Sequence, residues 1–407
     1  MQLTDIDPRV VQAAVAAQPA QFHTRDVSER PEMLAAHGAE ERMYHALVGK
    51  HLQAHAARLG LRFVGGKSSR GALWEKLDAV RSPREPAAFS GEQTTSAPAP
   101  PDDLDLGPQF DRDPPFTARM RRHQSWYRAA VLREPCGTDK GTTTRRGSQL
   151  TTEAGERGRN FVTDEIFEVA RRRVEGRRGT LDPDRLFRNM LSSQPMCFNL
   201  FAPLVADEER AARLLAPIVG GPIARVPVRE IEWAPAPPAD YLADRTAFDV
   251  YFEVERPDGA RIALGIETKL TDSFSKEHYD RPEYRRWMRG SRSPWRADAG
   301  SRVDDVRHNQ LWRDHLLAIA LRDHPRSRFA EGMLALVRHP FDLDGAAAVA
   351  SYERLLVEGD RSFVDLQLDE ILERWAPLVR DHERPWLDAF RLRYLDLARS
   401  EGATAPR

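Results

Sequence analysis

The stretch from Phe248 to Leu270 constrains the fold more than any other part of the 407-residue chain, because apolar and polar residues alternate through it on both sides of a turn. A period of two is typical of a strand that buries one face. The tripeptide Pro257-Asp258-Gly259 has the composition of a turn. The stretch therefore predicts an antiparallel hairpin, with strands at 246–256 and 260–270 that each have one apolar face to bury.

The register of this hairpin follows from burial, because a slip of one residue would move a whole apolar set into water. Matching the two apolar faces pairs Val254 with Ile262, Phe252 with Leu264, and Val250 with Ile266. This register requires a turn with an odd number of residues, or a bulge, rather than a strict two-residue turn.

The same register places Asp249 opposite Glu267, with Lys269 further along the same polar face. Cross-strand partners have Cβ atoms roughly 4.5–5.5 Å apart, so two carboxylates there could share one divalent cation. Without a cation the two like charges repel and raise each other's pKa, and a bound Mg²⁺ reverses that effect. The alternative is that these residues simply decorate the solvent side of a hairpin. Small residues beside Glu267, namely Ala263 and Gly265, favour a site because they let another group approach closely.

These residues carry a resemblance to a known family. Phe248-Asp249 followed by Gly265-Ile266-Glu267-Thr268-Lys269 resembles the Asp…Glu-x-Lys signature of the PD-(D/E)XK nuclease superfamily, which has the restriction-endonuclease-like fold. The run from Arg188 to Phe201 is similar to a bacterial subgroup of restriction-endonuclease-like proteins. The resemblance covers roughly residues 119 to 340.

The resemblance implies an α/β fold with an αβββαβ core around a mixed sheet. The periodicities along the chain give the same order of elements: a helix at 207–219, strands at 226–233, 246–256 and 260–270, a helix at 304–322 and a strand at 331–339. Within the preceding basic region, Gln194 and Asn199 are expected as buried amides that brace the core rather than as catalytic groups.

The resemblance also implies roles for individual residues. Asp249 and Glu267 would hold Mg²⁺ or Mn²⁺ through oxygen ligands, and Lys269 would orient water or stabilise developing charge. Gln310 is a candidate active-site amide with His308 nearby, although Asp314 stands where the superfamily frequently has lysine or tyrosine. A third acidic ligand stays open among three candidates: Glu208, Glu209 and Glu232.

The domain organisation is read from shifts in composition. Residues 63–68 include Gly65-Gly66-Lys67-Ser68, which lacks the earlier glycine of a phosphate-binding loop because position 61 is leucine, so an ordinary loop is expected. The predicted regions are an N-terminal helical region at 1–82, a Pro/Ala-rich linker at 83–118, a basic helical region packing on the core at 119–204, the nuclease core at 205–341, and a C-terminal helical region at 342–407.

The charge and the cysteine content of the chain limit the kinds of binding partner and metal site that it can have. The net charge is −1, so nucleic-acid binding would depend on local patches or on metal-bridged phosphates. Residues 119–178 supply such a patch, with 15 Lys or Arg against 8 Asp or Glu, and residues 276–313 add a second group of arginines. Two cysteines exclude a disulfide framework and a cysteine-based zinc cluster. No apolar run is long enough to span a membrane and Met1–Val10 does not resemble a signal peptide, so a soluble cytoplasmic protein is expected.

The function that these features favour is a metal-dependent nuclease that hydrolyses phosphodiester bonds, with DNA as the preferred substrate and restriction or phage defence as the setting. The alternative is a catalytically inactive nucleic-acid-binding module or an interaction scaffold with the same fold. A homodimer or a complex with a partner subunit is compatible with both.

Overall fold

The structure is a computed structural model that describes residues 14, 21–23, 61–68, 71–76, 104–176, 181–275 and 277–401. Contacts between residues divide the chain into two compact units, Met1–Ser96 and Ala97–Arg407. Among the described residues, no helix is long and apolar enough to cross a membrane.

Apart from Ala14, which is helical, the described residues of the first unit form a three-stranded antiparallel sheet. The strands are β1 (Gln21–His23), β2 (Leu61–Ser68) and β3 (Gly71–Lys76), in the order β1-β3-β2. The prediction of helix is therefore wrong in these ranges, and Gly65–Ser68 belongs to a strand rather than a loop. In the register of β2 and β3, Phe63 is the partner of Trp74. The helical spacing had been read from Tyr44 to Leu59, which lies outside the described residues.

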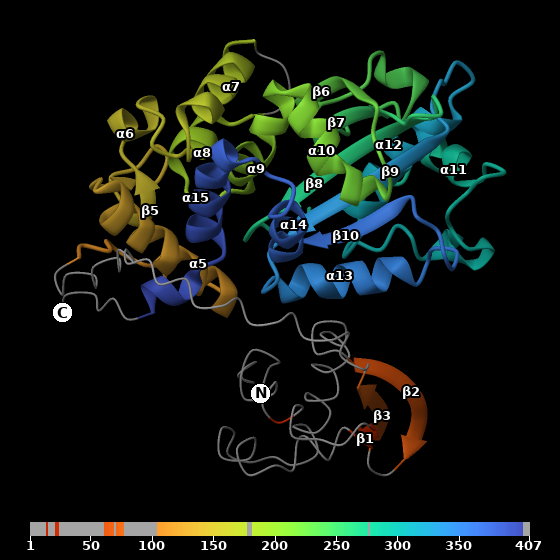
Figure 1. The fold of residues 1–407 in the computed structure, drawn as a ribbon, viewed down its shortest axis with the longest axis horizontal. Helices are drawn as coiled ribbons and strands as arrows, with labels where there is room; N and C mark the ends of the chain where they lie inside the picture. The colour runs from red at the N-terminus through yellow and green to blue at the C-terminus, as the bar shows by residue number, and fades with distance from the viewer. Residues whose placement is uncertain are drawn as a thin grey trace. The chain divides into compact units, whose positions relative to one another are not determined.

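The second unit is built on a five-stranded mixed sheet with the strand order β10-β9-β8-β7-β6 (Figure 1). Its strands are β6 (Arg225–Trp233), β7 (Phe248–Glu255), β8 (Arg261–Lys269), β9 (Glu331–Arg338) and β10 (Phe363–Gln367). Strands β6, β7 and β8 are antiparallel neighbours, whereas β9 is parallel to both β8 and β10. With α10 (Glu208–Val219) before β6 and α12 (Asn309–Asp323) before β9, the predicted αβββαβ core is confirmed.

The predicted hairpin register is also confirmed. Val254 pairs with Ile262, Phe252 with Leu264, and Val250 with Ile266. The turn between the strands spans residues 256–260, an odd number, and is closed by the Arg256 N–H donating to Ala260 O at 2.8 Å. Gly259 adopts φ +84° there, a conformation that favours glycine.

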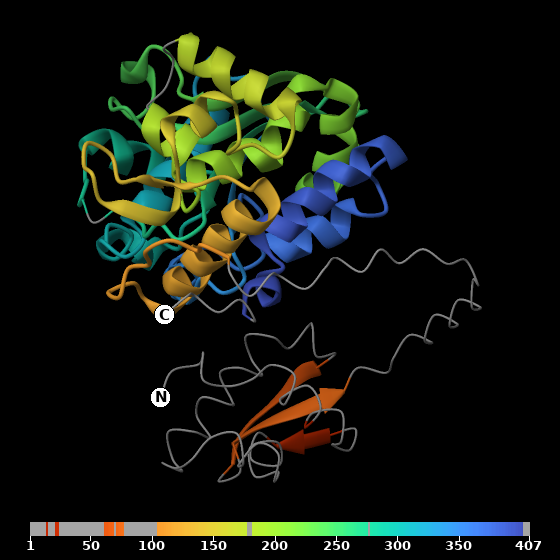
Figure 2. The same cartoon turned by 90° about the vertical axis from the view of Figure 1, so that its left-hand side faces the viewer.

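Helices cover both faces of this sheet (Figures 1 and 2). One face, with Val250, Phe252 and Ile266, packs in one apolar core with α9 (Ser193–Ala206), α10 and α14 (Leu368–Trp375). The other face, with Tyr251 and Ala263, packs in a second core with α11 (Pro282–Met288) and α12. The alternative that the polar side of the hairpin faces solvent is therefore wrong along most of its length, because Tyr251, Glu253 and Ala263 are buried, with Tyr251 and Ala263 in the core that contains α12.

Helix α12 begins five residues later than its apolar pattern suggests. Asp305 does not cap the helix as an acidic residue at its start would. Its carboxylate instead accepts the Arg307 N–H at 2.9 Å, which holds residues 305–307 in a turn. The later start places Gln310 in the first helical turn.

The region before the core is helical with one inserted hairpin. Helix α5 (Pro115–Trp126) continues into a π-helical turn, η2 (Tyr127–Leu132). The strands β4 (Cys136–Thr138) and β5 (Arg145–Leu150) form a two-stranded sheet that the sequence did not predict. The helices α6 (Thr152–Glu156), α7 (Asp164–Glu175), α8 (Pro183–Arg188) and α9 follow. Of the predicted linker, residues 104–118 are ordered here: Leu106 is buried and α5 begins at Pro115.

The C-terminal region is helical except for β10. It contains α13 (Leu343–Glu353), β10, α14 and α15 (Arg384–Tyr394). The prediction of helix alone is wrong at β10, where Phe363 and Leu366 are buried and the strand extends the sheet beside β9. Short 3₁₀ turns complete the unit: η3 (Pro238–Asp240), η4 (Ala297–Ser301), η5 (Asp381–Glu383) and η6 (Leu397–Ser400).

A buried polar network joins the C-terminal helix α15 to the earlier helices. Arg393 is fully buried and donates to Gln124 Oε1 at 3.2 Å and to both the carbonyl and the side-chain oxygen of Asn160 at 2.7 and 2.5 Å. Asn199 donates to Asn160 O at 3.1 Å and to the Tyr394 hydroxyl at 2.9 Å. Asn199 is thus a buried amide that braces the core, as predicted.

Candidate active site

The four predicted site residues gather where β7 begins, β8 ends and α12 starts. Asp249 is the second residue of β7, Glu267 and Lys269 close β8, and Gln310 lies in the first turn of α12. The hydrogen-bonded ladder of the hairpin stops at the pair Val250–Ile266. Beyond that pair, Asp249 Oδ2 accepts hydrogen bonds from the backbone N–H of Thr268 at 2.8 Å and from its hydroxyl at 2.6 Å.

Glu267, Lys269 and Gln310 form a closed triangle of polar contacts. Glu267 Oε1 lies 2.9 Å from Lys269 Nζ and accepts from Gln310 Nε2 at 2.6 Å. Lys269 Nζ also donates to Gln310 Oε1 at 3.3 Å, and the Ser275 N–H donates to that same oxygen at 3.0 Å. Both ends of the Gln310 amide are therefore used to hold the acid and the lysine of the motif.

The carboxylates of this site are under electrostatic strain. Burial and the neighbouring charge of Glu267 raise the pKa of Asp249 to about 7. Lys269 is nearly buried, and burial by itself would lower its pKa, but the charges of Glu267 and Asp249 outweigh burial and raise the pKa of Lys269 above its usual value. The lysine therefore remains protonated beside the two acids.

A third buried carboxylate, Asp314, belongs to the same cluster, and sequence reasoning missed it. It is four residues after Gln310 on α12, which places both side chains on one face of the helix. Asp314 is 4% exposed and its Oδ2 is buried without a hydrogen-bond partner. Burial and the charge of Glu267 raise its pKa well above the usual range. The available signal was its spacing from Gln310, which had been read only as a departure from the family pattern.

Of the three candidates for a further acidic ligand, only Glu232 lies beside the pair. It falls on β6 between Ile231, which pairs with Val250, and Trp233, which pairs with Phe248, so it stands across from Asp249. Its φ of +57° is unusual for a residue other than glycine and marks a local irregularity of the strand.

The other two candidates, Glu208 and Glu209, are engaged elsewhere. Glu208 accepts the Val226 N–H at 3.0 Å, at the opposite end of β6, and Glu209 pairs with Arg380. Seven residues of strand separate Val226 from Trp233, a distance of roughly 20 Å. His308 is likewise not part of the cluster, since its Nε2 contacts Arg302 O at 2.9 Å and its ring lies against Tyr352.

The small residues of the hairpin serve packing rather than access. A Cβ atom on Gly265 would lie 2.3 Å from the ring of Phe248, and Ala263 is fully buried against the second core. The interpretation that these residues make room for an outside group is therefore wrong. The ring of Phe248 occupies that space and stacks with Trp233.

The donor set fits a hard divalent cation, though with few protein ligands. Within the described ranges, no three acidic, histidine or cysteine side chains are arranged to enclose a metal ion. The hydrogen bonds to the two motif acids fall on Asp249 Oδ2 and Glu267 Oε1, which leaves the second oxygen of each carboxylate for other partners. One or two carboxylates completed by water and phosphate oxygens is the usual binding mode of Mg²⁺.

The basic region offers fewer free cations than its composition suggests. Arg121 pairs with Asp113, Arg146 with Asp139, and Arg171 with both Glu168 and Glu175. Arg128 is buried and donates to backbone carbonyls, including Gly147 O at 2.8 Å. Much of the local excess of positive charge is therefore already engaged in contacts within the fold.

The mixed sheet, its flanking helices and the cluster at the hairpin end define a restriction-endonuclease-like α/β protein. A family model described as the PD-(D/E)XK nuclease superfamily matches residues 111–396, and the chain belongs to that superfamily. The match extends beyond the range 119–340 over which the sequence resemblance was recognised, and includes β10 and most of the C-terminal helices. No curated protein and no solved structure gives a significant match to the chain.

Proposed function

We propose that this protein is a metal-dependent nuclease that cleaves phosphodiester bonds in DNA, with Asp249, Glu267, Lys269 and Gln310 as its active site. Membership of the nuclease superfamily supports nuclease activity and a nucleic-acid substrate. The observation that carries the assignment of residues is the convergence of the motif acids and lysine with Gln310 at the end of one hairpin. A DNA substrate, a cytoplasmic setting, and a role in restriction or phage defence are part of the proposal.

The roles follow from the contacts. Asp249 and Glu267 would hold a divalent cation, Mg²⁺ or Mn²⁺, through their carboxylate oxygens. Such a cation, when bound, neutralises the scissile phosphate and lowers the pKa of a bound water. Lys269 stays protonated beside the acids, so it stabilises charge that develops on the phosphate rather than removing a proton. Gln310 fixes the positions of Glu267 and Lys269 through both ends of its amide.

Cleavage of plasmid DNA and of RNA, with Mg²⁺, with Mn²⁺ and with EDTA, tests the proposal. The variants Asp249→Ala, Glu267→Ala and Lys269→Ala should each lose activity while remaining folded at the assay temperature, which thermal unfolding checks. Glu331→Ala is a matched control, because Glu331 pairs with Arg256 at the far end of the sheet. This variant should cleave at the rate of the parent. Cleavage that survives EDTA, or full activity of Asp249→Ala, would falsify the assignment. Salt-dependent nucleic-acid binding without any cleavage would support the inactive binding module instead.

A further inference from the structure

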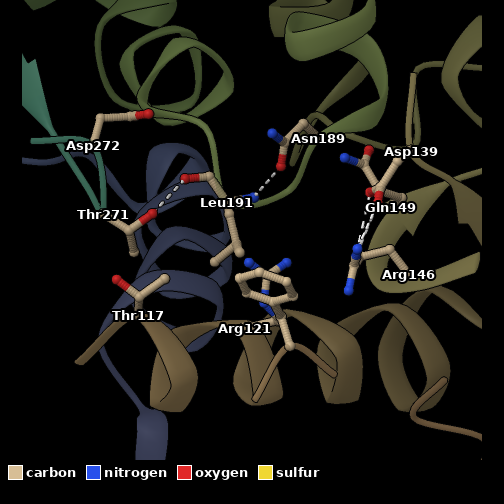
Figure 3. A pocket seen from close by; sticks show the side chains of 10 residues that line it. Thr117, Arg121, Asp139, Arg146, Gln149, Asn189, Leu191, Thr271 and Asp272 are labelled. Atoms are coloured by element: carbon tan, nitrogen blue, oxygen red, sulfur yellow. Dashed lines mark hydrogen bonds and ion pairs between the residues drawn. The ribbon is translucent and has the colours of Figure 1, made fainter. Parts of the chain in front are cut away.

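A polar cavity of about 310 Å³ lies in the second unit, and its lining includes the two residues Thr271 and Asp272 that follow β8 (Figure 3). This volume is at the lower end of the range of about 300–1,000 Å³ that is typical of small-molecule sites. The walls come from α5, the β4–β5 hairpin, the segment between α8 and α9, and the residues that follow β8. Figure 3 shows side chains from these separate segments facing one shared space.

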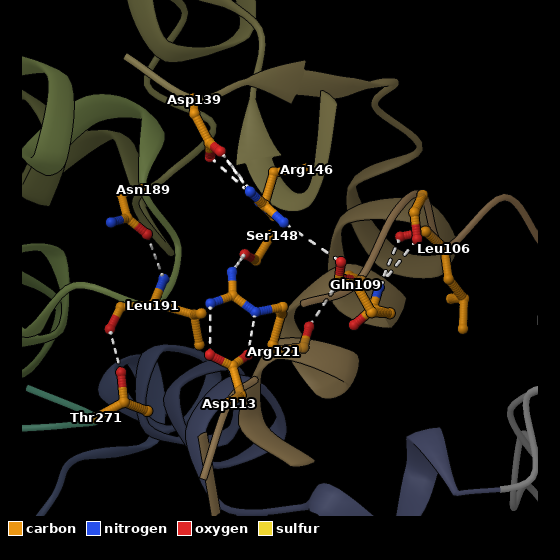
Figure 4. A network of polar contacts seen from close by, with 12 residues as sticks. Leu106, Gln109, Asp113, Arg121, Asp139, Arg146, Ser148, Asn189, Leu191 and Thr271 are labelled. Atoms are coloured by element: carbon orange, nitrogen blue, oxygen red, sulfur yellow. Dashed lines mark hydrogen bonds and ion pairs between the residues drawn. The ribbon is translucent and has the colours of Figure 1, made fainter. Parts of the chain in front are cut away.

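The two guanidinium groups of this cavity are already neutralised (Figure 4). Arg121 makes two contacts with the Asp113 carboxylate, at 2.5 and 3.1 Å, and donates to the Ser148 hydroxyl at 3.0 Å. Arg146 contacts Asp139 at 2.6 Å. A phosphate would have to compete with these carboxylates, so the lining suits a ligand that is polar but uncharged.

An aromatic ring provides a stacking surface at the same place. Phe110 is 41% exposed, an unusual state for a phenylalanine. The guanidinium carbons of Arg146 and Arg121 lie 5.1 and 5.9 Å from its ring centroid, which holds the ring at the edge of the cavity. Exposed aromatic rings of this kind stack on unpaired bases of nucleic acids.

Hydrogen-bonding groups of both kinds also face the cavity. Gln149 is 8% exposed, and its Oε1 is buried without a hydrogen-bond partner. A backbone bridge joins Gln149 to Asn189, whose Oδ1 accepts the Leu191 N–H at 3.0 Å, so that the amide nitrogen of Asn189 is the end that can meet a ligand. The cavity thus offers one buried acceptor and one donor beside a flat apolar surface, which is the complement of a nucleobase.

The cavity is lined on one side by residues that follow β8. Thr271, which lines it, follows Lys269 by two residues, and two residues of chain span at most about 7 Å. The Thr271 hydroxyl donates to Leu191 O at 3.2 Å, which ties this wall to the segment before α9.

We propose that this cavity binds a single nucleobase of the substrate, turned out of its stack, next to the bond that is cleaved. The inference rests on the proposed nuclease function, because it takes the ligand to be part of the same nucleic acid. A base that has been turned out of a duplex is held by stacking and by hydrogen bonds to its edge, and these are the groups present here.

Binding of free deoxynucleosides tests the cavity without any need for catalysis. Isothermal titration of each of the four deoxynucleosides, and of inorganic phosphate, into metal-free full-length protein should show binding of at least one nucleoside and none of phosphate. Phe110→Ala and Gln149→Leu should each weaken that binding about tenfold or more. Phe341→Ala is the matched control, since Phe341 is also exposed and lies under an arginine, Arg119, but is not part of the cavity.

A second measurement connects the cavity to cleavage. A series of DNA substrates would each lack one base, at successive positions. The cleavage rate of the parent should fall when the missing base is at one position near the scissile bond. The cleavage rate of Phe110→Ala should not change when that same base is missing. Cleavage of DNA by a protein that binds no nucleoside, or nucleoside binding that Phe110→Ala and Gln149→Leu leave unchanged, would overturn the nucleobase site and leave the nuclease proposal standing. Nucleoside binding by a protein that cleaves neither DNA nor RNA would overturn the nuclease proposal and leave a nucleobase site.

Discussion

The two ends of the β7–β8 hairpin bury acidic residues on the same face in opposite ways. Near the turn, Glu253 is 2% exposed and contacts Arg261 at 3.3 Å and Arg328 at 2.6 Å. At the open end, Glu267 is 5% exposed and contacts Lys269 at 2.9 Å, and burial together with the charge of Glu267 raises the pKa of Asp249 and of Asp314.

The acid near the turn, Glu253, forms ion pairs that support the fold. The acids at the open end form a cluster that does not. The two arginines around Glu253 more than balance its charge, and their side chains are 34% and 60% exposed, so they remain partly hydrated. At the other end, three carboxylates share one lysine. Burying charge without balance costs several kcal/mol per ion, and folding gains nothing from that arrangement. A surplus of buried negative charge beside a protonated lysine is instead suited to a cation and a phosphate.

The largest expected effect is on catalysis at the open end. Asp249→Asn and Glu267→Gln should each reduce the rate of metal-dependent cleavage by about 10³-fold or more. The rate of the double variant should be little lower than that of either single variant, because the two acids act as a unit. The melting temperature of the metal-free protein should not fall in Asp249→Asn, which removes a repulsive charge, but should fall in Glu267→Gln, which leaves the buried Lys269 without its carboxylate partner. Single-turnover cleavage rates with Mg²⁺, measured beside thermal unfolding, check both statements. Losses that simply multiply in the double variant would contradict a shared metal site.

The next effect is on stability at the turn end. Glu253→Gln should lower the free energy of unfolding by about 2 kcal/mol, less than the loss of a fully buried pair because Arg328 and Arg261 can turn toward water. Its cleavage rate should match that of the parent. Urea unfolding gives the stability, and Glu255→Gln is the control, since its more exposed pair with Arg261 should contribute under about 1 kcal/mol. An activity loss in Glu253→Gln without a stability loss would erase the contrast between the two ends.

A smaller effect is expected at Asp314. Asp314→Asn removes a buried charge whose Oδ2 has no partner, so it should stabilise the metal-free protein by about 1 kcal/mol. The Mg²⁺ concentration for half-maximal cleavage should rise several-fold, because one negative charge near the cation is lost. Thermal unfolding in EDTA and a Mg²⁺ titration of the cleavage rate measure the two effects. A clear loss of stability would show that the Asp314 carboxylate supports the fold.

The smallest effect is a dependence on pH. The pKa of Asp249 in the folded protein is about 7, raised by burial and by Glu267 above the usual value of about 4 that applies to the unfolded chain. Its contribution to stability is therefore fully present below about pH 4 and is lost as the pH rises through 7. The melting-temperature advantage of metal-free Asp249→Asn over the parent should shrink between pH 8 and pH 5. A difference that stays constant over this range would argue that Asp249 titrates normally.

The sequence was most informative where local pattern decides the structure. Alternation from Phe248 to Leu270 determined the hairpin, its odd turn and its register, and the register brought Asp249 and Glu267 together. The order of helices and strands around the hairpin was also predicted correctly. Gln310 was found through the family pattern, and its contacts with Glu267 and Lys269 agree with that assignment. The roles of these residues stay predictions.

What the sequence did not reveal depends on contacts between distant segments. Tyr251 and Ala263 are buried in the same core as α12, a helix that is itself buried almost all round, so neither the hairpin nor the helix shows a solvent-facing side that could be matched from the sequence. Strand β10 is too short to stand out in a helical region and is held by its pairing with β9. Asp314 was read only as a departure from the family pattern, because its burial is set by packing and not by its neighbours in the chain.

The buried network around Arg393 has a consequence for how the protein is made. Its partners, Gln124 and Asn160, leave the ribosome more than 230 residues before it, since the separation from Asn160 alone is 233 positions. Domains generally form during synthesis as soon as their contacts are available. Here the polar groups of α5 and of the segment before α7 lack their partner until α15 has been synthesised. Bringing α15 back to them closes a long loop, and the entropic cost of closure rises only slowly with loop length. A nascent chain therefore carries the whole Asp249–Glu267 hairpin well before the fold around it is finished, and that fold is complete only after translation has reached α15.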